Sequence, residues 1–398
     1  MSFPVHAGVF TEVETQDLQL HFNLNGEIIR AKGKGSGWTH PHEWLKRTMG
    51  NDWIYYSTGG YTGVYETTGE YYLPNMPYTT NGLLGGKPFQ LDEVNTVIET
   101  WPERITDIAE TATSPPDDFR HFLQNVAKNN LQSLAAKAAD LFSICGGRST
   151  VLPPDTRHVD YNVIPLTVAN GCLYKCSFCE VKNKKPFSPK STEAIQSQIQ
   201  KLKKLYGRDL TNYNSIFLGE HDALHRGSPT LLETLDSCYQ EFGFSTNYMS
   251  GCNAFLFGSA SSLLNTPESF FKELEQLPYT VYINIGLESA DQQTLDMLGK
   301  PISSKLVTDC FQRIQAINDT YSTTEITANF VFDEGLPDNH VPSFLHLVRD
   351  SLDRNKPKGC IYLSPLKFGS PSRAQTFVFN RLKVLSRVPT FLYIIQRL

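Results

Sequence analysis

The sequence has no long uninterrupted apolar run. None of its hydrophobic stretches approaches the ~20 residues that a membrane-spanning helix needs. The N-terminus, MSFPVHAGVF, has no basic stretch followed by an apolar one, so no secretory signal is expected. Charged residues make up only 19% of the 398 residues, too few for a disordered chain. The net charge of −5 gives no general attraction to nucleic acid, although a local basic patch would still allow one.

The sequence also lacks the paired cysteine spacing of a disulfide-stapled protein. Of its eight cysteines, five stand alone and three fall within eight positions, at Cys172, Cys176 and Cys179. A disulfide framework spreads its cysteines in pairs through a short secreted chain. The pattern instead indicates a reducing compartment, which we expect to be the cytoplasm, and one metal site.

Residues 1–150 are predicted to form an N-terminal α+β domain that is rich in glycine and aromatic residues. Leu18–Leu24 alternates apolar and polar positions, and Asn25–Gly26 supplies the positive φ angles of a tight hairpin turn. Further short strands are expected between residues 53 and 78. A helical stripe over residues 117–142, with a break near Asn129, follows. The sequence assigns this domain to no particular fold, and we expect it to cover the mouth of the next domain and help to define the substrate.

In residues 151–370, strands and helices alternate. The expected strands are 161–168, 215–218, 244–249, 280–287, 325–332 and 360–363, and the expected helices are 191–205, 229–242, 267–277, 291–298, 303–317 and 341–352. Such alternation predicts parallel strands joined by right-handed helical crossovers. We expect an α/β fold in the form of a partial (β/α)6 TIM-type barrel. A doubly wound open sheet gives the same alternation and stays open as an alternative.

The three clustered cysteines follow the first expected barrel strand. Thiolates at positions i, i+4 and i+7 of a loop can converge on one soft metal centre. A 4Fe–4S cluster held by only three cysteines leaves one iron open to a substrate or cofactor. A structural zinc site needs a fourth ligand, and no Cys or His follows at zinc-finger spacing. Buried thiols without a shared ligand would not be expected to recur at the spacing i, i+4 and i+7.

The spacing Cys-x3-Cys-x2-Cys, with Phe178 directly before the last cysteine, resembles the signature of the radical S-adenosylmethionine (SAM) enzymes. The resemblance covers about residues 158–366. It implies that Cys172, Cys176 and Cys179 ligate three irons of a 4Fe–4S cluster. The amino and carboxylate groups of S-adenosylmethionine would then chelate the fourth iron, and Phe178 would pack near its adenine.

Two further segments are similar to family features. Leu218-Gly219-Glu220 resembles a Gly-Gly-Glu turn, which implies that Gly219 and Glu220 receive the methionyl amino group; Leu218 departs from the pattern. A carboxylate suits an ammonium group through a charge-assisted hydrogen bond. The plainer interpretation of Glu220 is an exposed loop acid.

The segment 284–290, Asn-Ile-Gly-Leu-Glu-Ser-Ala, is similar to one in the subgroup of anaerobic coproporphyrinogen dehydrogenases, elongator-type enzymes and methylthiotransferases. The similarity implies that Glu288 contacts the ribose hydroxyls or the methionyl end of the cofactor. The plainer interpretation is that Glu288 is solvated while Ser289 caps a helix. Backbone groups of residues 328–332 and 362–365 would flank the adenine.

The resemblance implies a radical SAM enzyme. A reduced cluster donates an electron into the sulfonium of S-adenosylmethionine, and the resulting 5′-deoxyadenosyl radical abstracts hydrogen from an unidentified small-molecule substrate. A low-potential electron donor such as flavodoxin or ferredoxin is the implied partner. One alternative is an iron–sulfur electron-transfer or sensing protein, against which Glu220 and Glu288 argue. The other is an RNA-modifying radical SAM enzyme, against which the acidic balance and the lack of an aromatic-basic platform argue.

Four weaker candidates have ordinary structural alternatives. His221 could face the substrate, and Cys252 could donate hydrogen or ligate metal, but packing roles are at least as well supported. The basic residues 182–190 could guide an anionic substrate or a reductant, or could simply be a solvated loop. Residues 371–398 form a basic amphipathic segment, which could contact a membrane peripherally or could close the barrel bottom.

Overall fold

The N-terminal domain is built on an antiparallel sheet. The computed structural model describes residues 8–38, 43–57, 88–113, 115–148, 151–174, 176–179, 186–366 and 373–392. The sheet runs in the order β1-β2-β3-β4-β5, with strands β1 Thr11–Glu14, β2 Leu18–Phe22, β3 Ile28–Gly33, β4 Glu43–Arg47 and β5 Trp53–Ser57. The expected hairpin is confirmed, because β2 pairs with β3 across a turn in which Gly26 has φ +78°. Most of the strands expected up to residue 78 lie outside the described residues.

Three helices follow the sheet: α2 Asp92–Thr111, α3 Asp117–Ala127 and α4 Leu131–Cys145. The break expected near Asn129 is confirmed, and Asn130 caps α4 by accepting a hydrogen bond from Ser133 N. Helix α2 was not predicted, although its buried residues Val94, Val97 and Trp101 recur at helical spacing. These side chains pack in one apolar core with the antiparallel sheet.

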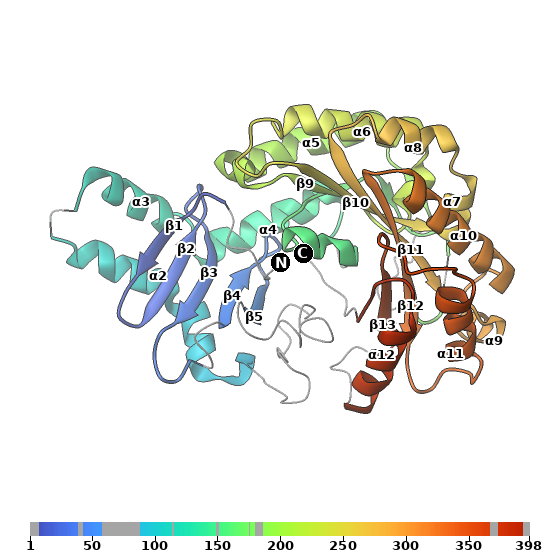
Figure 1. Ribbon diagram of the computed structural model, residues 1–398. Coiled ribbons are helices and arrows are strands. Elements are labelled where there is room, and N and C mark those ends of the chain that lie inside the picture. The colour runs from blue at the N-terminus through green and yellow to red at the C-terminus, as the bar shows by residue number, and fades with distance from the viewer. Residues whose placement is uncertain are drawn as a thin grey trace.

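The second domain is a curved, all-parallel sheet of seven strands, in the order β14-β13-β12-β11-β10-β9-β6 (Figure 1). The strands are β6 Ile164–Thr167, β9 Ser215–Gly219, β10 Cys252–Ser259, β11 Tyr279–Glu288, β12 Thr324–Phe332, β13 Ile361–Pro365 and β14 Thr390–Leu392. Strands β6 and β14 form the two edges, so the barrel is partial. The expected fold class, an α/β partial barrel, is confirmed, and β14 is a strand beyond the six that were expected.

Helices connect successive strands and cover the outer face of this sheet (Figure 1). They are α5 Thr192–Tyr206, α6 Ser228–Glu241, α7 Ala260–Asn265, α8 Glu268–Leu274, α9 Gln292–Met297, α10 Ser304–Thr320, α11 His340–Leu345 and α12 Arg373–Leu385. Each connection returns the chain to the same end of the sheet. All strands therefore end, at their carboxyl termini, on one face of the barrel, which is where such folds place their active sites.

The prediction for the third barrel strand is wrong. Residues 244–249 form turns after α6, in which Phe244 is buried against Phe242 and Tyr279. The strand is β10, which begins at Cys252 and pairs there with Tyr279 of β11. An apolar residue anchoring a turn is indistinguishable from a strand residue in so short a segment.

The N-terminal domain contacts the barrel at the amino ends of its strands. Asn25 Nδ2 donates to Tyr206 O over 2.7 Å, and Leu24 N donates to Asp209 Oδ1 over 3.3 Å, just before β9. Lys46 Nζ lies 3.0 Å from Asp160 Oδ2, just before β6. These contacts lie at the end of the barrel opposite the carboxyl ends of the strands. The expected role as a substrate cover stays a prediction, since residues 58–87 lie outside the described residues.

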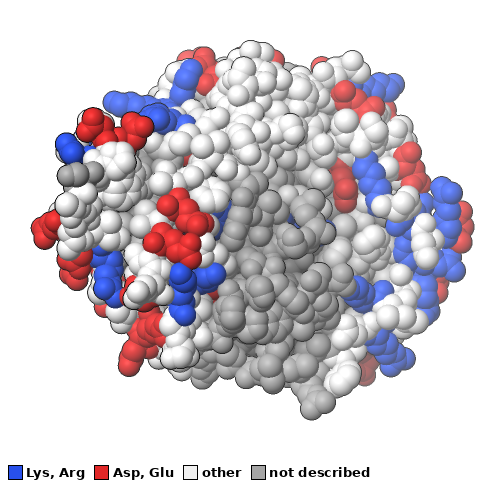
Figure 2. Space-filling model, turned by 60° about the vertical axis from the view of Figure 1, so that its left-hand side comes forward, with Lys and Arg blue, Asp and Glu red and all other residues white. Residues whose placement is uncertain are grey.

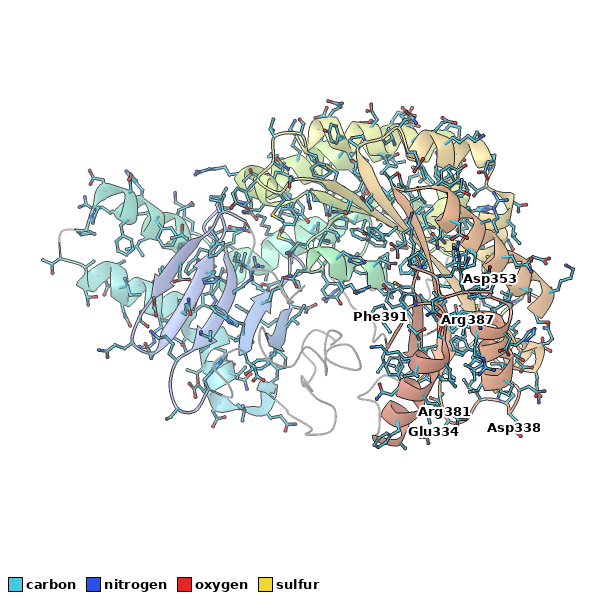
Figure 3. All side chains as sticks on the ribbon, in the orientation of Figure 1. Glu334, Asp338, Asp353, Arg381, Arg387 and Phe391 are labelled. Carbon is cyan, nitrogen blue, oxygen red and sulfur yellow. The ribbon has the colours of Figure 1, made fainter. Side chains whose placement is uncertain are left out.

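The C-terminal segment contributes to the barrel. Strand β14 pairs in parallel with β13, and Phe379 and Leu382 of α12 are buried. Arg387, which is labelled in Figure 3, donates from Nη1 to Leu352 O. Val384 is 83% exposed. The expected membrane contact of residues 371–398 stays a prediction, and 393–398 lie outside the described residues.

The described surface carries both signs of charge. On the face shown in Figure 2, Lys and Arg side chains are interspersed with Asp and Glu side chains. Within the described residues, no helix combines the length and the apolarity that crossing a membrane requires.

Candidate active site

A cavity of about 1240 Å³, including its open mouth, lies at the carboxyl ends of the barrel strands. Its wall contains all three clustered cysteines and Phe178, together with residues that follow or end the strands. These include His221, Asp222, Phe257, Ser259, Gly286, Glu288, Lys300, Asn329, Val331 and Ser364. Residues that are far apart in sequence therefore meet at one place.

The cysteine loop is closed at its base by two short paired strands, β7 Ala169–Asn170 and β8 Ser188–Pro189. Its middle is fixed by side chains. The Tyr174 hydroxyl lies 2.6 Å from Ser261 Oγ, and Ser177 donates to Leu298 O from both N and Oγ, over 3.0 and 2.8 Å. The loop is thus held against the segment that follows α9. Of the basic stretch after it, residues 182, 184 and 185 lie outside the described residues.

The cysteine environment suits ligands that must be held away from water. Burial raises the pKa of Cys176 to about 11, while Lys300 acts to lower it. Burial also raises the pKa of Cys172. Such thiols need a metal to hold them as thiolates.

The three thiols match the ligand set of a 4Fe–4S cluster with one open iron. A 4Fe–4S cluster places each cysteine on a different iron, so its ligands do not have to converge on one point. The three cysteines share one cavity wall, and Cys176 interacts electrostatically with both others. These residues therefore fit a three-cysteine cluster.

The backbone is irregular at the end of β11, and this irregularity sets the direction of the Glu288 side chain. The register with β12 shifts between Gly286 and Glu288, and Glu288 has φ +66°, in the left-handed region. Its Oε1 accepts a hydrogen bond from Lys300 Nζ over 3.0 Å. Sequence reasoning missed Lys300, which lies 12 residues after Glu288 and directly follows Gly299.

Gly286 lies beneath this ion pair. A Cβ on Gly286 would lie 2.6 Å from Glu288 Oε1 and 3.3 Å from Lys300 Nζ. Because Gly286 has no side chain, the Glu288–Lys300 ion pair can pack directly against strand β11. The missing side chain also leaves room between Ser259 and Asn329, which flank Gly286 in the register of the neighbouring strands.

Glu220 and Gly219 lie at the expected strand end but are not part of the described cavity wall. Gly219 is a buried residue of β9. Glu220 has a buried Oε2 with no hydrogen-bond partner among the described residues. That oxygen lies 4.0 Å from Nε2 of His221, which does line the cavity. An orphaned carboxylate oxygen beside the cavity fits the ammonium group of an amino-acid ligand.

His221 and Asp222 have different surroundings. Burial lowers the pKa of His221, so the imidazole facing the cavity is neutral near pH 7. Asp222 accepts hydrogen bonds from Ser259 N over 3.1 Å and from Ser262 Oγ over 2.8 Å. Asp222 therefore has a structural role in joining β9 to β10, while His221 is available to a ligand.

A polar network lies below the cavity, inside the barrel. Asn329 and Asn284 exchange side-chain hydrogen bonds of 2.6 and 3.1 Å, and Asn284 donates to Thr327 Oγ1 over 2.9 Å. Thr327 and Tyr362 both donate to Asp155, each over 2.7 Å. Burial raises the pKa of Asp155 to about 6. Only Asn329 of this network reaches the described cavity wall, so the network fixes the orientation of its amide.

Cys252 is excluded from the site by its place in the strand. It is the first residue of β10, whereas the cavity is lined by Phe257, Gly258 and Ser259 at the other end. The interpretation of Cys252 as a hydrogen donor or ligand depended on the misplaced third strand. Its packing role follows from its burial beside Tyr279.

The chain is similar to several solved structures. The cobalamin-dependent S-adenosylmethionine radical enzyme OxsB, with aqua-cobalamin and S-adenosylmethionine bound, matches over 57% of this chain and 30% of its own, with 17% identity and a TM-score of 0.35. A radical SAM methyltransferase from Sphaerobacter thermophilus matches over 58% and 66%, with 15% identity and a TM-score of 0.39. Streptococcus suis SuiB bound to precursor peptide SuiA matches over 96% and 72%, with 8% identity and a TM-score of 0.40.

The chain resembles radical SAM enzymes. It spans only about 30% of the length of OxsB, and these identities and TM-scores are low. No protein-family model and no curated protein matches the sequence. The functional assignment therefore rests on the arrangement of this chain's own residues.

Proposed function

We propose that this chain is a radical SAM enzyme that cleaves S-adenosylmethionine reductively and uses the resulting radical on a small-molecule substrate. The observation that carries the proposal is the meeting of Cys172, Cys176, Cys179 and Glu288 in one cavity at the carboxyl ends of the strands. The cysteine spacing supplies the specificity of the assignment. The cavity supplies the room for a nucleoside-sized ligand beside the cysteines.

Each residue has a part in this proposal. The three cysteines hold the cluster through thiolates, and the carboxylate of Glu220 receives the amino group of S-adenosylmethionine. Phe178 packs on the adenine, and Glu288 accepts hydrogen bonds from the ribose hydroxyls or the methionyl end. When bound and reduced, the 4Fe–4S cluster supplies one electron to the sulfonium, which breaks the C5′–S bond and yields methionine and a 5′-deoxyadenosyl radical.

The protein also excludes competing partners for a radical. Besides Phe178, the cavity wall contains the apolar side chains of Phe257 and Val331. Such a lining restricts access of water and of reductants to the reacting carbon. The oriented amide of Asn329 offers a neutral hydrogen-bonding group for the substrate.

The partners and the location complete the proposal. A low-potential donor such as flavodoxin or ferredoxin supplies the electron, and the enzyme works in the cytoplasm. A peripheral membrane contact through α12 is a further element, supported by the exposed Val384 on a helix that carries Arg381 and Lys383. The net charge of −5 favours a small molecule over RNA as substrate.

The test is reductive cleavage by the reconstituted enzyme. The protein is loaded anaerobically with iron and sulfide, reduced with dithionite in the presence of S-adenosylmethionine, and assayed for 5′-deoxyadenosine. We expect cleavage in the wild type and none in Cys176→Ala. Cys238→Ala, which removes a buried thiol of α6 outside the site, is the matched control and should retain activity. An intact 4Fe–4S cluster that neither binds nor cleaves S-adenosylmethionine contradicts the proposal and favours an electron-transfer protein.

A further inference from the structure

Lys300 is a buried cation beside the cysteine loop. It belongs to the segment after α9 to which Ser177 is hydrogen-bonded through Leu298. Its Nζ lies 5.3 Å from the ring centre of Tyr174, which stands between the first two clustered cysteines. The side chain is only 6% exposed, and it lines the same cavity as all three cysteines.

Glu288 is the counter-charge of Lys300, and its Oε1 accepts a hydrogen bond from Lys300 Nζ over 3.0 Å. Both side chains line the cavity that contains the three cysteines. The side chain of Glu288 is 13% exposed, about twice as much as that of Lys300. The ammonium group is therefore the more deeply buried of the two charges and the less screened by water.

We propose that Lys300 raises the reduction potential of the cluster held by the three cysteines, and that Glu288 lowers it. The inference rests on the proposed function. Reduction adds one electron and hence one negative charge to the cluster, with no bond made or broken. A nearby cation stabilises the added charge, and burial strengthens this effect because little water is present to screen it.

The pair therefore sets how readily the cluster accepts an electron from its donor. A ligand that engages Glu288 through hydrogen bonds would weaken its hold on Lys300 and change the field at the cysteines. In this proposal Lys300 affects the reaction through the effect of its charge on the reduction potential of the cluster.

The test is a potentiometric titration of the reconstituted protein without S-adenosylmethionine, followed by electron paramagnetic resonance of the reduced cluster. At a potential where the wild-type cluster is half reduced, the reduced-to-oxidised ratio in Lys300→Met should fall about tenfold, a shift of about 59 mV for one electron. Glu288→Gln should shift the potential in the opposite direction. Lys300→Arg keeps the charge and should stay near the wild type.

Lys305→Met is the matched control, because Lys305 is 82% exposed on α10 and its removal should leave the potential unchanged. If Lys300→Met fails to hold a cluster, Lys300→Gln replaces it, with iron content measured for both. An intact cluster whose potential does not respond to Lys300, or that shifts in the same direction in Glu288→Gln, overturns the inference alone. A wild-type protein that cannot hold a 4Fe–4S cluster overturns the proposed function and this inference together.

Discussion

Gly299 lies so close to Ser177 that a side chain at position 299 would press against it. A Cβ on Gly299 would be 3.0 Å from Ser177 Oγ and 3.3 Å from Ser177 N, and Gly299 has φ +60°. The contact joins the middle of the cysteine loop to the segment that carries Lys300. The conformation of one segment is therefore tied to that of the other.

Gly299→Ala should displace the cysteine loop. Alanine is strained at a positive φ, and its methyl group would push Ser177 away from Leu298. We expect a loss of stability of roughly 1 kcal/mol or more and a lower iron and sulfide content after reconstitution. Gly335→Ala is the control, because its nearest neighbour, Asp333 Oδ1, is 3.7 Å away. Equal iron content in both variants would contradict the expectation.

Glu220→Gln should weaken the binding of amino-acid-bearing nucleosides. The change removes the charge that we propose meets the ligand ammonium, and a charge-assisted hydrogen bond is worth about 1.5–3 kcal/mol. S-adenosylhomocysteine has the same ammonium, so its affinity, measured by calorimetry, should fall roughly 10-fold to 100-fold. Glu334→Gln changes an exposed acid away from the cavity and should bind normally. An unchanged affinity in Glu220→Gln would identify Glu220 as an ordinary loop acid.

Asp155 should make the free energy of unfolding fall as the pH rises from about 4 to about 6. Its pKa is raised to about 6 from the ordinary 3.8, chiefly by burial and also by Glu325, against hydrogen bonds from Tyr362 and Thr327 and the charge of Arg157. Between these pH values the folded chain binds more protons than the unfolded chain, so raising the pH favours unfolding.

Asp155→Asn removes this titration. Compared with the wild type, its free energy of unfolding should decline less steeply over the same pH range, by up to about 1.4 kcal/mol per pH unit. Chemical denaturation at a series of pH values measures the difference. Parallel pH profiles for the two proteins would mean that Asp155 stays ionised throughout.

Val384→Asp should reduce binding to anionic vesicles if α12 contacts a membrane. Val384 is 83% exposed, so a charge there costs little in the folded protein but opposes insertion among lipid chains. Co-sedimentation with vesicles containing phosphatidylserine measures the binding. Val341→Asp, at an exposed valine of α11, is the control. Equal sedimentation of both variants and the wild type would remove the membrane proposal.

The parts of the fold that could be predicted are those with a clear period or signature. The βα alternation predicted the parallel strands and their helical crossovers because long helices and buried strands differ in both length and spacing, but it left a doubly wound open sheet as an alternative to the partial barrel. Strand β10 was misplaced because Phe244 has the same apolar signal in a turn as in a strand. Helix α2 was overlooked because residues 1–115 as a whole lack helical periodicity.

The candidate site also contains residues that could be predicted from the sequence and residues that could not. Cys172, Cys176, Cys179 and Glu288 could be selected from local spacing and from their places at strand ends, and the cavity brings them together. Lys300 could not be selected this way, because its importance comes from a contact across a helix and a left-handed turn. Asn329 likewise gains its role only from partners on neighbouring strands.

The docking of the N-terminal domain has a consequence for the chemistry at the other end of the barrel. The domain holds the starts of β6 and β9 through Asp160 and Asp209, and the same two strands lead directly into the cysteine loop and Glu220. Strands β6 and β9 are also hydrogen-bonded to each other, from Ile164 and Ile216 to Thr167 and Gly219. The N-terminal domain therefore contacts the start of the strand pair whose other end carries the cysteine loop and the acid proposed to receive the amino group.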